Sequence, residues 1–241
     1  MDTIKVSFAK TNITPKVPCT LIGYGLNGRE ATSVLDPIWA KRLTISDVTL
    51  FVFDTCFVNN IWQPNEIACA THNHSAPLFH YEMARKVLAE PAIIDNAQIF
   101  LAQTTCDVNI NRRRWTWKGV KTRPNPYGFK DNILTFVKII RENHPPIYLI
   151  NYACHAGMWH GPSVSADWPG RIKIDDAEIM FLQGFSGDLI PDNRIGDNFK
   201  AQAITEADMD RAGQRVADAV RQAEHRLRPC RGIFRIFNLV P

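Results

Sequence analysis

The sequence has no closely spaced pair of cysteines. A zinc site built from thiolates, or a redox-active dithiol, needs two cysteines about two residues apart. This absence argues against both kinds of site, and we expect buried free thiols instead. The six cysteines lie far apart along the chain, as Cys19, Cys56, Cys69, Cys106, Cys154 and Cys230.

The chain also has no long apolar segment. A membrane-spanning helix needs about 18 or more apolar residues in succession, and no stretch of the 241 residues reaches that length. The first ten residues, MDTIKVSFAK, carry charges where a secretory signal needs an uninterrupted apolar stretch. The sequence therefore predicts a cytoplasmic protein without a transmembrane segment, and a leader removed beforehand would leave no trace in it.

A concentrated block of one charge sign is missing as well. The 28 basic and 24 acidic residues give a formal net charge of +4, and the positive charges are dispersed along the chain. Binding to a phosphate backbone needs a basic stripe, so nucleic acid is excluded as the expected partner. The densest basic cluster, residues 112–114, lies beside two tryptophans and is expected to be a partly solvated loop.

What the sequence does contain is the composition of a globular protein with one large core. Hydrophobic residues make up 45% of the chain and charged residues 22%. Because the length suits a single core, we expect one domain over residues 1–241. Neither an internal repeat nor a low-complexity linker divides it.

Periodicity predicts an α/β fold with mixed β-sheets and flanking helices. The clearest helix covers residues 205–227, where apolar residues recur every three or four positions after a capping-box-like start at Thr205 and Asp208. Pro229 ends it. Strand-like runs cover residues 4–8, a hairpin at 38–46 and 48–58, then 66–71, a pair at 131–140 and 146–154, 179–184, and a final strand at 232–240.

Three of these strands end in polar clusters, and two of the clusters contain histidine. His72 and His74 follow the strand at 66–71, and residues two apart on a strand project to one face. His155 ends the run at 147–154, at what we expect to be the same sheet edge. Neutral imidazole is a good zinc ligand, and a third imidazole strengthens a metal site. The sequence thus predicts a site at the carboxyl ends of the strands.

Other interpretations remain for these residues. The pair His72 and His74 can equally be two hydrogen-bonded loop histidines, since the H-x-H spacing alone is a weak signal. Cys154 should point into the core, away from its neighbour His155, which argues against a Cys-His catalytic pair. His160, in a loop flanked by Gly and Pro, is expected at the surface.

A serine nucleophile is disfavoured by the spacing of glycines around Ser186. The segment GFSGD, residues 184–188, departs from the G-x-S-x-G elbow because its second glycine comes one place too early. A turn that exposes backbone N–H groups is the better use of these glycines.

Six segments in order resemble motifs of the neutral and alkaline ceramidase family. ATHNHSAP, residues 70–77, resembles the family's A-T-H-T-H-S-G-P, and NYACHAG, residues 151–157, resembles its A-C-H-P segment. The remaining matches are KTNITP with D-I-T-P, NINRR with an N-R segment, SADWPG with S-A-D-x-P-G, and FLQGFSGDLIP with F-L-Q-G-x-x-G-D-x-x-P.

The resemblance implies a zinc-dependent amide hydrolase. In that family one zinc ion activates water to cleave the amide of an N-acylated lipid, which implies a small-molecule or lipid-like amide as substrate. His72 and His155 would be zinc ligands, and His74 and Arg112 would handle protons and stabilise the developing oxyanion. Asp54 could orient a ligand histidine by a hydrogen bond, or simply end a strand in a turn.

Departures from the family pattern leave a rival interpretation open. The family's remaining ligands, a Glu and a Tyr, come from beyond the point where this chain stops, so the chain is expected to lack that C-terminal part. Ile190 replaces a serine found in many members, which weakens the case for ceramide itself, and Ala76 and Ala156 replace Gly and Pro. The helical segments expected near 58–65 and 171–178 are short. The rival is an incomplete domain that binds metal or ligand without turnover.

Overall fold

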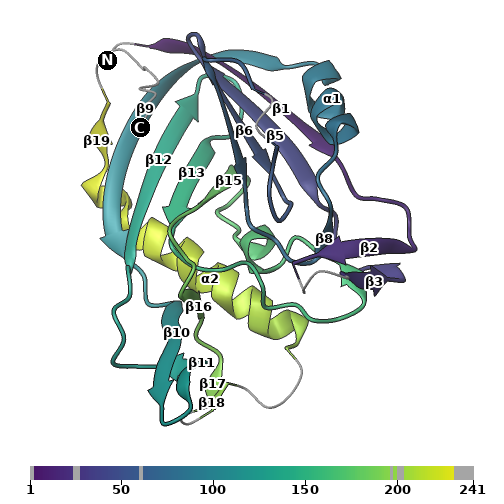
Figure 1. Ribbon diagram of the computed structural model, residues 1–241. Coiled ribbons are helices and arrows are strands. Elements are labelled where there is room, and N and C mark those ends of the chain that lie inside the picture. The colour runs from purple at the N-terminus through teal and green to yellow at the C-terminus, as the bar shows by residue number, and fades with distance from the viewer. Residues whose placement is uncertain (1–2, 24–27, 60–61, 196–197, 200–203, 231–241) are drawn as a thin grey trace.

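A computed structural model describes residues 3–23, 28–59, 62–195, 198–199 and 204–230 (Figure 1). The strands are β1 Ile4–Asn12, β2 Cys19–Ile22, β3 Arg29–Ala31, β4 Ser33–Val34, β5 Trp39–Ile45, β6 Val48–Phe53, β7 Glu66–Ala70, β8 Ala76–Pro77, β9 Ile93–Thr105, β10 Asn109–Thr116, β11 Gly119–Asn125, β12 Ile133–Arg141, β13 Ile147–Tyr152, β14 Ser163–Val164, β15 Glu178–Gln183, β16 Leu189–Pro191, β17 Arg194–Ile195, β18 Asn198–Phe199 and β19 Arg228–Pro229. The helices are α1 Tyr81–Ala89 and α2 Glu206–Ala223, with 3-10 turns η1 Trp168–Arg171 and η2 Glu224–Arg226.

One large mixed sheet organises the fold. Its strand order is β15-β13-β12-β9-β1-β5-β6-β7, with β19 paired to β9. All neighbours are antiparallel except the two outermost pairs, β6 with β7 and β13 with β15. The sheet curls so strongly that β15 contacts both β6 and β7. The predicted α/β class with mixed sheets is confirmed, and the curl brings the two parallel pairs together.

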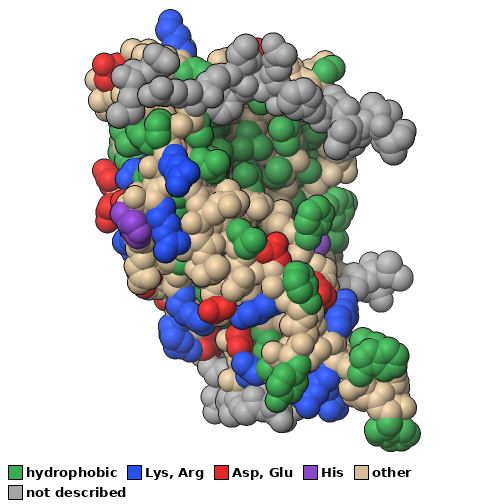
Figure 2. Space-filling view, turned by 90° about the vertical axis from the view of Figure 1, so that its left-hand side faces the viewer, with side chains coloured by type: hydrophobic (Ala, Val, Ile, Leu, Met, Phe, Trp, Pro, Cys, Tyr) green, Lys and Arg blue, Asp and Glu red, His purple; other side chains and the backbone are tan. Residues whose placement is uncertain are grey.

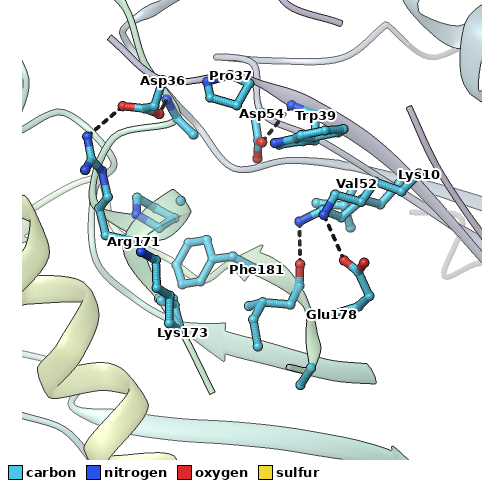
Figure 3. A pocket seen from close by; sticks show the side chains of 17 residues that line it. Lys10, Asp36, Pro37, Trp39, Val52, Asp54, Arg171, Lys173, Glu178 and Phe181 are labelled. Carbon is cyan, nitrogen blue, oxygen red and sulfur yellow. Dashed lines mark hydrogen bonds and ion pairs between the residues drawn. The ribbon is translucent and has the colours of Figure 1, made fainter. Parts of the chain in front are cut away.

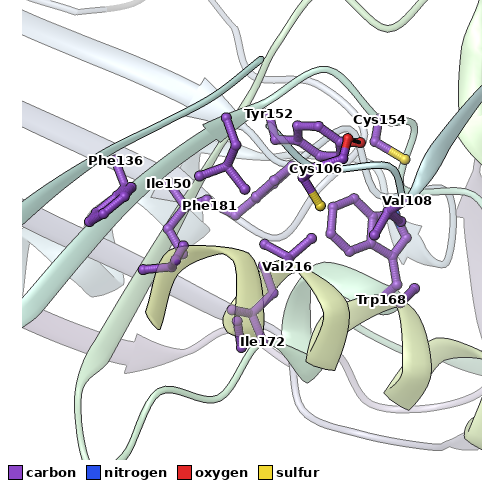
Figure 4. Packing of buried hydrophobic residues seen from close by; sticks show 14 of the residues in the cluster. Cys106, Val108, Phe136, Ile150, Tyr152, Cys154, Trp168, Ile172, Phe181 and Val216 are labelled. Atoms are coloured by element: carbon purple, nitrogen blue, oxygen red, sulfur yellow. Dashed lines mark hydrogen bonds between the residues drawn. The ribbon is translucent and has the colours of Figure 1, made fainter. Parts of the chain in front are cut away.

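Helix α2 covers one end of the sheet and closes the main core (Figures 1 and 4). Its predicted start is confirmed, because Thr205 and Asp208 form a reciprocal capping box. Val216 and its helical neighbours pack against Phe136, Ile150 and Trp168. Fully burying each such apolar side chain contributes about 1.5 to 3 kcal/mol. The helix ends four residues before the predicted position, and η2 continues it as a tighter turn.

The strands predicted from alternation are confirmed, with ends shifted by a few residues. The predicted hairpin corresponds to β5 and β6, and the pair at 131–154 to β12 and β13. The longest elements that were not predicted are helix α1, strand β9, and the hairpin of β10 with β11; several strands of two to four residues were not predicted either. No α-helix occupies the described parts of 58–65 or 171–178. The final strand predicted at 232–240 lies outside the described residues.

Two predictions need correction, one about the basic cluster and one about the burial of the cysteines. Residues 112–114 were predicted to form a loop, but they belong to strand β10, which pairs with β11. The prediction of buried thiols holds for Cys56, Cys106 and Cys154, whereas Cys19 and Cys69 are half-buried and Cys230 is exposed. All six are free. No described helix is long and apolar enough to cross a membrane.

Candidate metal centre

The ends of the two parallel strand pairs meet at one place. His72 and His74 follow β7, and Cys56 follows its parallel neighbour β6. His155 follows β13, and the loop with Ser186 follows its parallel neighbour β15. Parallel neighbours end at the same sheet edge, and the curl of the sheet joins the two edges.

Three imidazole rings form the centre of this place. The ring centroid of His72 lies 5.1 Å from that of His74 and 4.4 Å from that of His155, and the remaining pair is 4.7 Å apart. All three contacts are edge-to-face. The histidines that the sequence placed after two different strands are therefore in mutual contact.

Backbone carbonyls fix the tautomers of two of the rings. The Nδ1 atom of His72 lies 2.9 Å from the carbonyl oxygen of Cys56, and Nδ1 of His155 lies 3.3 Å from that of Ser186. Since a carbonyl oxygen only accepts, both Nδ1 atoms carry the proton. Each Nε2 atom then presents a lone pair, which is the arrangement found at metal-bound histidines.

His74 completes the cluster as a proton donor. Its Nε2 atom lies 2.9 Å from Nε2 of His155, and because the latter is an acceptor, His74 donates. Burial, helped by His72 and Arg112, lowers the pKa of His74 to about 4 and that of His155 to about 3. Both rings are therefore neutral at pH 7, the state that binds a metal ion.

Asn73 fastens the loop between the first two histidines. Its side-chain Nδ2 donates to the carbonyl oxygens of Asp54 and Ser165, and its Oδ1 accepts from the Ser75 N–H. The backbone N–H of His74 donates to the Ala156 carbonyl. The loop is held so firmly that His72 adopts a left-handed backbone, with φ of +59°.

The SADWPG segment, residues 165–170, holds the backbone around His155 in place. The buried Asp167 carboxylate accepts hydrogen bonds from the backbone N–H groups of Met158, Trp159 and Trp168. The indole N–H of Trp168 donates to the His155 carbonyl at 2.9 Å. Burial raises the pKa of Asp167, and the three N–H donors oppose that rise. The segment therefore shapes the loop of residues 155–168.

Gly23 packs directly on the ring of His74. A Cβ atom at this position would lie 2.6 Å from Cγ of His74, and the backbone φ of Gly23 is +123°. Both facts require glycine here. The contact between Gly23 and His74 could not be identified from the sequence, because the two residues lie in separate segments.

Arg112 borders the cluster from strand β10. Its Nη2 donates to the Gly187 carbonyl at 3.0 Å, while its buried Nε has no hydrogen-bond partner among the described residues. Burial and the neighbouring Arg113 lower the pKa of Arg112, which nevertheless stays charged. A half-buried guanidinium whose Nε–H is a spare donor can receive an anionic oxygen.

Cys56 was missed as a site residue. Its Sγ and the ring nitrogens of His72 and His74 all lie within 4.8 Å of one another, so the three can hold a metal ion together. Burial raises the pKa of the Cys56 thiol, which is neutral until a cation displaces its proton. The sequence signal that could have identified Cys56 is its position three residues after β6, the strand that pairs with β7. It was overlooked because a single cysteine forms no spacing motif.

The Asp54 carboxylate does not contact a histidine of the cluster, although it was expected to orient one. Its carboxylate accepts from the Trp39 N–H at 2.9 Å and lines a cavity of about 300 Å³ (Figure 3). The described residues of that cavity include none of the three histidines. Asp54 instead reaches the cluster through its backbone carbonyl, which accepts from Asn73.

Ser186 lacks the contacts of a nucleophile. Its carbonyl, and not its hydroxyl, meets the ring of His155. Within the described part of the chain no base contacts the Ser186 hydroxyl, which agrees with the departure from the elbow motif. His160 is exposed, as its loop position predicted.

Comparison with known proteins finds similarity at the level of three-dimensional structure. No family model and no curated protein sequence matches the chain. A solved neutral ceramidase from Pseudomonas aeruginosa superposes with a TM-score of 0.69 at 12% identity, over 93% of this chain and 45% of that chain. A ceramidase solved in complex with C2 superposes with the same score and identity, over 92% and 44%. The chain spans less than half the length of these enzymes, and it has the fold of the neutral ceramidases.

Proposed function

We propose that this protein is a zinc-dependent hydrolase that cleaves an amide bond by metal-activated water. The observation that carries the proposal is the pair of His72 and His155, whose Nδ1 atoms meet backbone carbonyls, so that each Nε2 atom carries a lone pair. A metal ion bound to Nε2 of His155 would replace the hydrogen bond that this atom accepts from His74. Ordinary loop histidines need no such matched orientation from two distant segments. The ceramidase-like fold supports amide hydrolysis as the reaction.

The residues present fit a zinc ion. Zinc takes imidazole nitrogen and thiolate sulfur in tetrahedral sites. Among the described residues Cys56, His72 and His74 offer both within 4.8 Å of one another, and Nε2 of His155 lies 2.9 Å from that of His74. The rings of His72 and His155 are held by carbonyl acceptors, as metal-bound histidines usually are. When bound, zinc would lower the pKa of a water molecule to about 7 and polarise the substrate carbonyl.

His74 and Arg112 supply the remaining functions. Nε2 of His74 carries a proton and lies next to the proposed ligand His155. The neutral ring can therefore take a proton from water only at its Nδ1 atom, and it can then pass a proton to the leaving amine. Arg112 brings a positive charge and a spare buried N–H donor toward the same cluster. We assign it to the oxyanion that forms as the amide carbonyl is attacked.

The substrate class is an N-acylated, lipid-like amide. The support is the fold shared with ceramidases, one of which was solved from Pseudomonas aeruginosa. Ile190 stands where many family members carry serine, so we propose an amide other than ceramide as the preferred substrate.

One observation favours the alternative of binding without turnover. The described group at the cluster consists of histidine and cysteine, and it includes no carboxylate. Catalytic zinc sites commonly use three protein ligands and keep one position open. If the thiol of Cys56 closes the site with all three histidines, the metal becomes structural.

Elemental metal analysis tests the proposal first. Wild type should hold about one zinc per chain, and His72→Ala and His155→Ala should each lose it. His225→Ala is the matched control, because His225 is exposed on η2 and should leave the zinc content unchanged. Absence of zinc from wild type would overturn the metal site.

Hydrolysis of N-acyl amides then separates enzyme from binder. His74→Gln and Arg112→Gln should retain zinc and lose activity, by about 100-fold or more for the proton-transfer group. Cys56→Ser should lose zinc if the Cys56 thiol is a metal ligand. It should keep both zinc and activity if the thiol only lies beside the metal. Zinc without any turnover in wild type would favour the binding domain.

A further inference from the structure

The hairpin of β10 and β11, together with the segment that follows β11 as far as Phe129, exposes large aromatic side chains that the core does not use. The exposed fractions are 81% for Trp115, 90% for Trp117, 94% for Tyr127 and 83% for Phe129. Nearby Phe185, in the loop with Ser186, is 96% exposed. Single exposed apolar residues need no explanation, but a group of bulky aromatic rings marks an interaction surface.

The same hairpin is strongly basic. Residues 112–129 contain six arginines and lysines and no acidic residue. The chain has a formal net charge of +4, so the hairpin segment contributes +6 and all other residues together −2. No ion pair within the described part of the chain involves these six cations. Six of the 28 basic residues thus gather in this one segment, although the positive charges are otherwise dispersed along the chain.

The hairpin projects from the body of the molecule. It pairs with β16 only at residues 109–111, and beyond that point neither of its faces is buried as a core strand would be. Figure 1 places β10 and β11 at the end opposite the β5–β6 turn, and Figure 2 shows hydrophobic and basic side chains together at that end. Trp115 lies directly opposite Val120, which is itself half exposed.

We propose that this hairpin, with Phe185, docks the protein on a membrane surface that contains anionic lipids. Tryptophan and tyrosine rings prefer the level of the lipid headgroups, and each nearby Lys or Arg adds attraction to an anionic leaflet. We choose a lipid surface as the partner because the aromatic rings stand on a protruding hairpin, which can enter the headgroup layer, and not within a groove. Stacking of nucleic-acid bases uses aromatic rings within a basic groove.

Docking through the hairpin would also present the metal centre to the lipid. Arg112 begins the basic run on β10 and contacts Gly187, one residue from the Ser186 carbonyl that holds His155. The histidine cluster and the docking hairpin are thus joined by one strand. That docking brings lipid substrate to the metal centre rests on the proposed hydrolase function. Docking on the membrane does not depend on that function.

Vesicle co-sedimentation of the full chain tests the proposal. The probe is phosphatidylcholine vesicles with or without phosphatidylserine, free of any amide substrate and without added zinc. Wild type should bind the anionic vesicles, less at high salt. Lys118→Gln with Lys121→Gln should weaken binding about fivefold for each charge removed. Trp115→Ala with Trp117→Ala should weaken it further and abolish quenching of tryptophan fluorescence by brominated lipid.

Matched variants and competing partners decide the outcome. Ile94→Ala with Lys173→Gln removes one exposed apolar side chain and one exposed cation far from the hairpin, and should bind as wild type. His72→Ala should also bind as wild type, which separates docking from the metal site. The proposal is overturned if the hairpin variants bind like wild type. It is equally overturned if the hairpin instead mediates self-association or preferential binding to single-stranded RNA.

Discussion

The Nε2 atoms of His74 and His155 lie 2.9 Å apart, although 81 residues separate them in the sequence. His155 can only accept in this contact, because its Nδ1 proton is committed to the Ser186 carbonyl. The pair is therefore an ordered donor and acceptor, with the donor placed beside a proposed metal ligand. This order gives His74 a role different from that of the two other histidines.

Zinc should stabilise the folded chain through these rings. A ligand that binds only the folded state at 100 times its Kd contributes about 2.7 kcal/mol. We expect added zinc to raise the Tm of wild type and a chelator to reverse that rise, as measured by calorimetry. His155→Ala should show neither effect, and an equal response in that variant would locate the zinc elsewhere.

Replacement of Gly23 by alanine should disturb the metal centre. The new Cβ would lie 2.6 Å from Cγ of His74 and would force a residue with φ of +123°, at a cost of more than about 1 kcal/mol. We expect zinc affinity to fall about 10- to 100-fold, as for other residues that support ligands. Gly119→Ala is the control, since Gly119 has φ of +86° and no atom within 4 Å of its added Cβ. Equal zinc affinity in both variants would refute the steric argument.

The Asp167 carboxylate should be essential for the loop behind His155. Its loss leaves three buried backbone N–H groups without an acceptor, at a combined cost of at least about 3 kcal/mol. Urea unfolding of Asp167→Ala should show this loss, whereas Asp176→Ala, at an exposed position, should unfold like wild type. A small effect at Asp167 would mean that water replaces the carboxylate.

Acid should remove a stabilising contribution from Asp95. Its hydrogen bond with His144, aided by Asn143, lowers its pKa from 3.8 to about 2. A carboxyl whose folded pKa is depressed stabilises the fold above its unfolded pKa, and that contribution disappears as pH falls toward 2. Asp95→Asn should therefore be less stable than wild type at pH 7, and the difference should shrink between about pH 4 and pH 2.

Urea unfolding at a series of pH values measures that difference. Asp47→Asn, in the exposed turn between β5 and β6, serves as the control and should follow wild type throughout. A gap between Asp95→Asn and wild type that stays constant down to pH 2 would contradict the assignment.

The sequence by itself determined the strands that carry the site. Alternation and apolar runs depend on neighbours two to four residues away, so β5, β6, β7, β13, β15 and α2 could be predicted from the chain. The positions of His72, His74 and His155 at strand ends followed from these elements. The β10–β11 hairpin escaped prediction because most of its few apolar residues are exposed. Helix α1 escaped because its nine residues are too few for a helical period to stand out, although Met83, Ala84 and Val87 are buried.

Only the tertiary structure decided which residues meet. The curl of the sheet joins the ends of β6 and β7 to those of β13 and β15, and such curvature results from packing across the whole sheet. Cys56 and Gly23 reach His74 through contacts that no local pattern encodes. Asp54 illustrates the same limit, since its carboxylate binds Trp39 and only its backbone supports the site. Spacing along a chain predicts facing side chains within one element, whereas contacts between elements depend on how the elements pack.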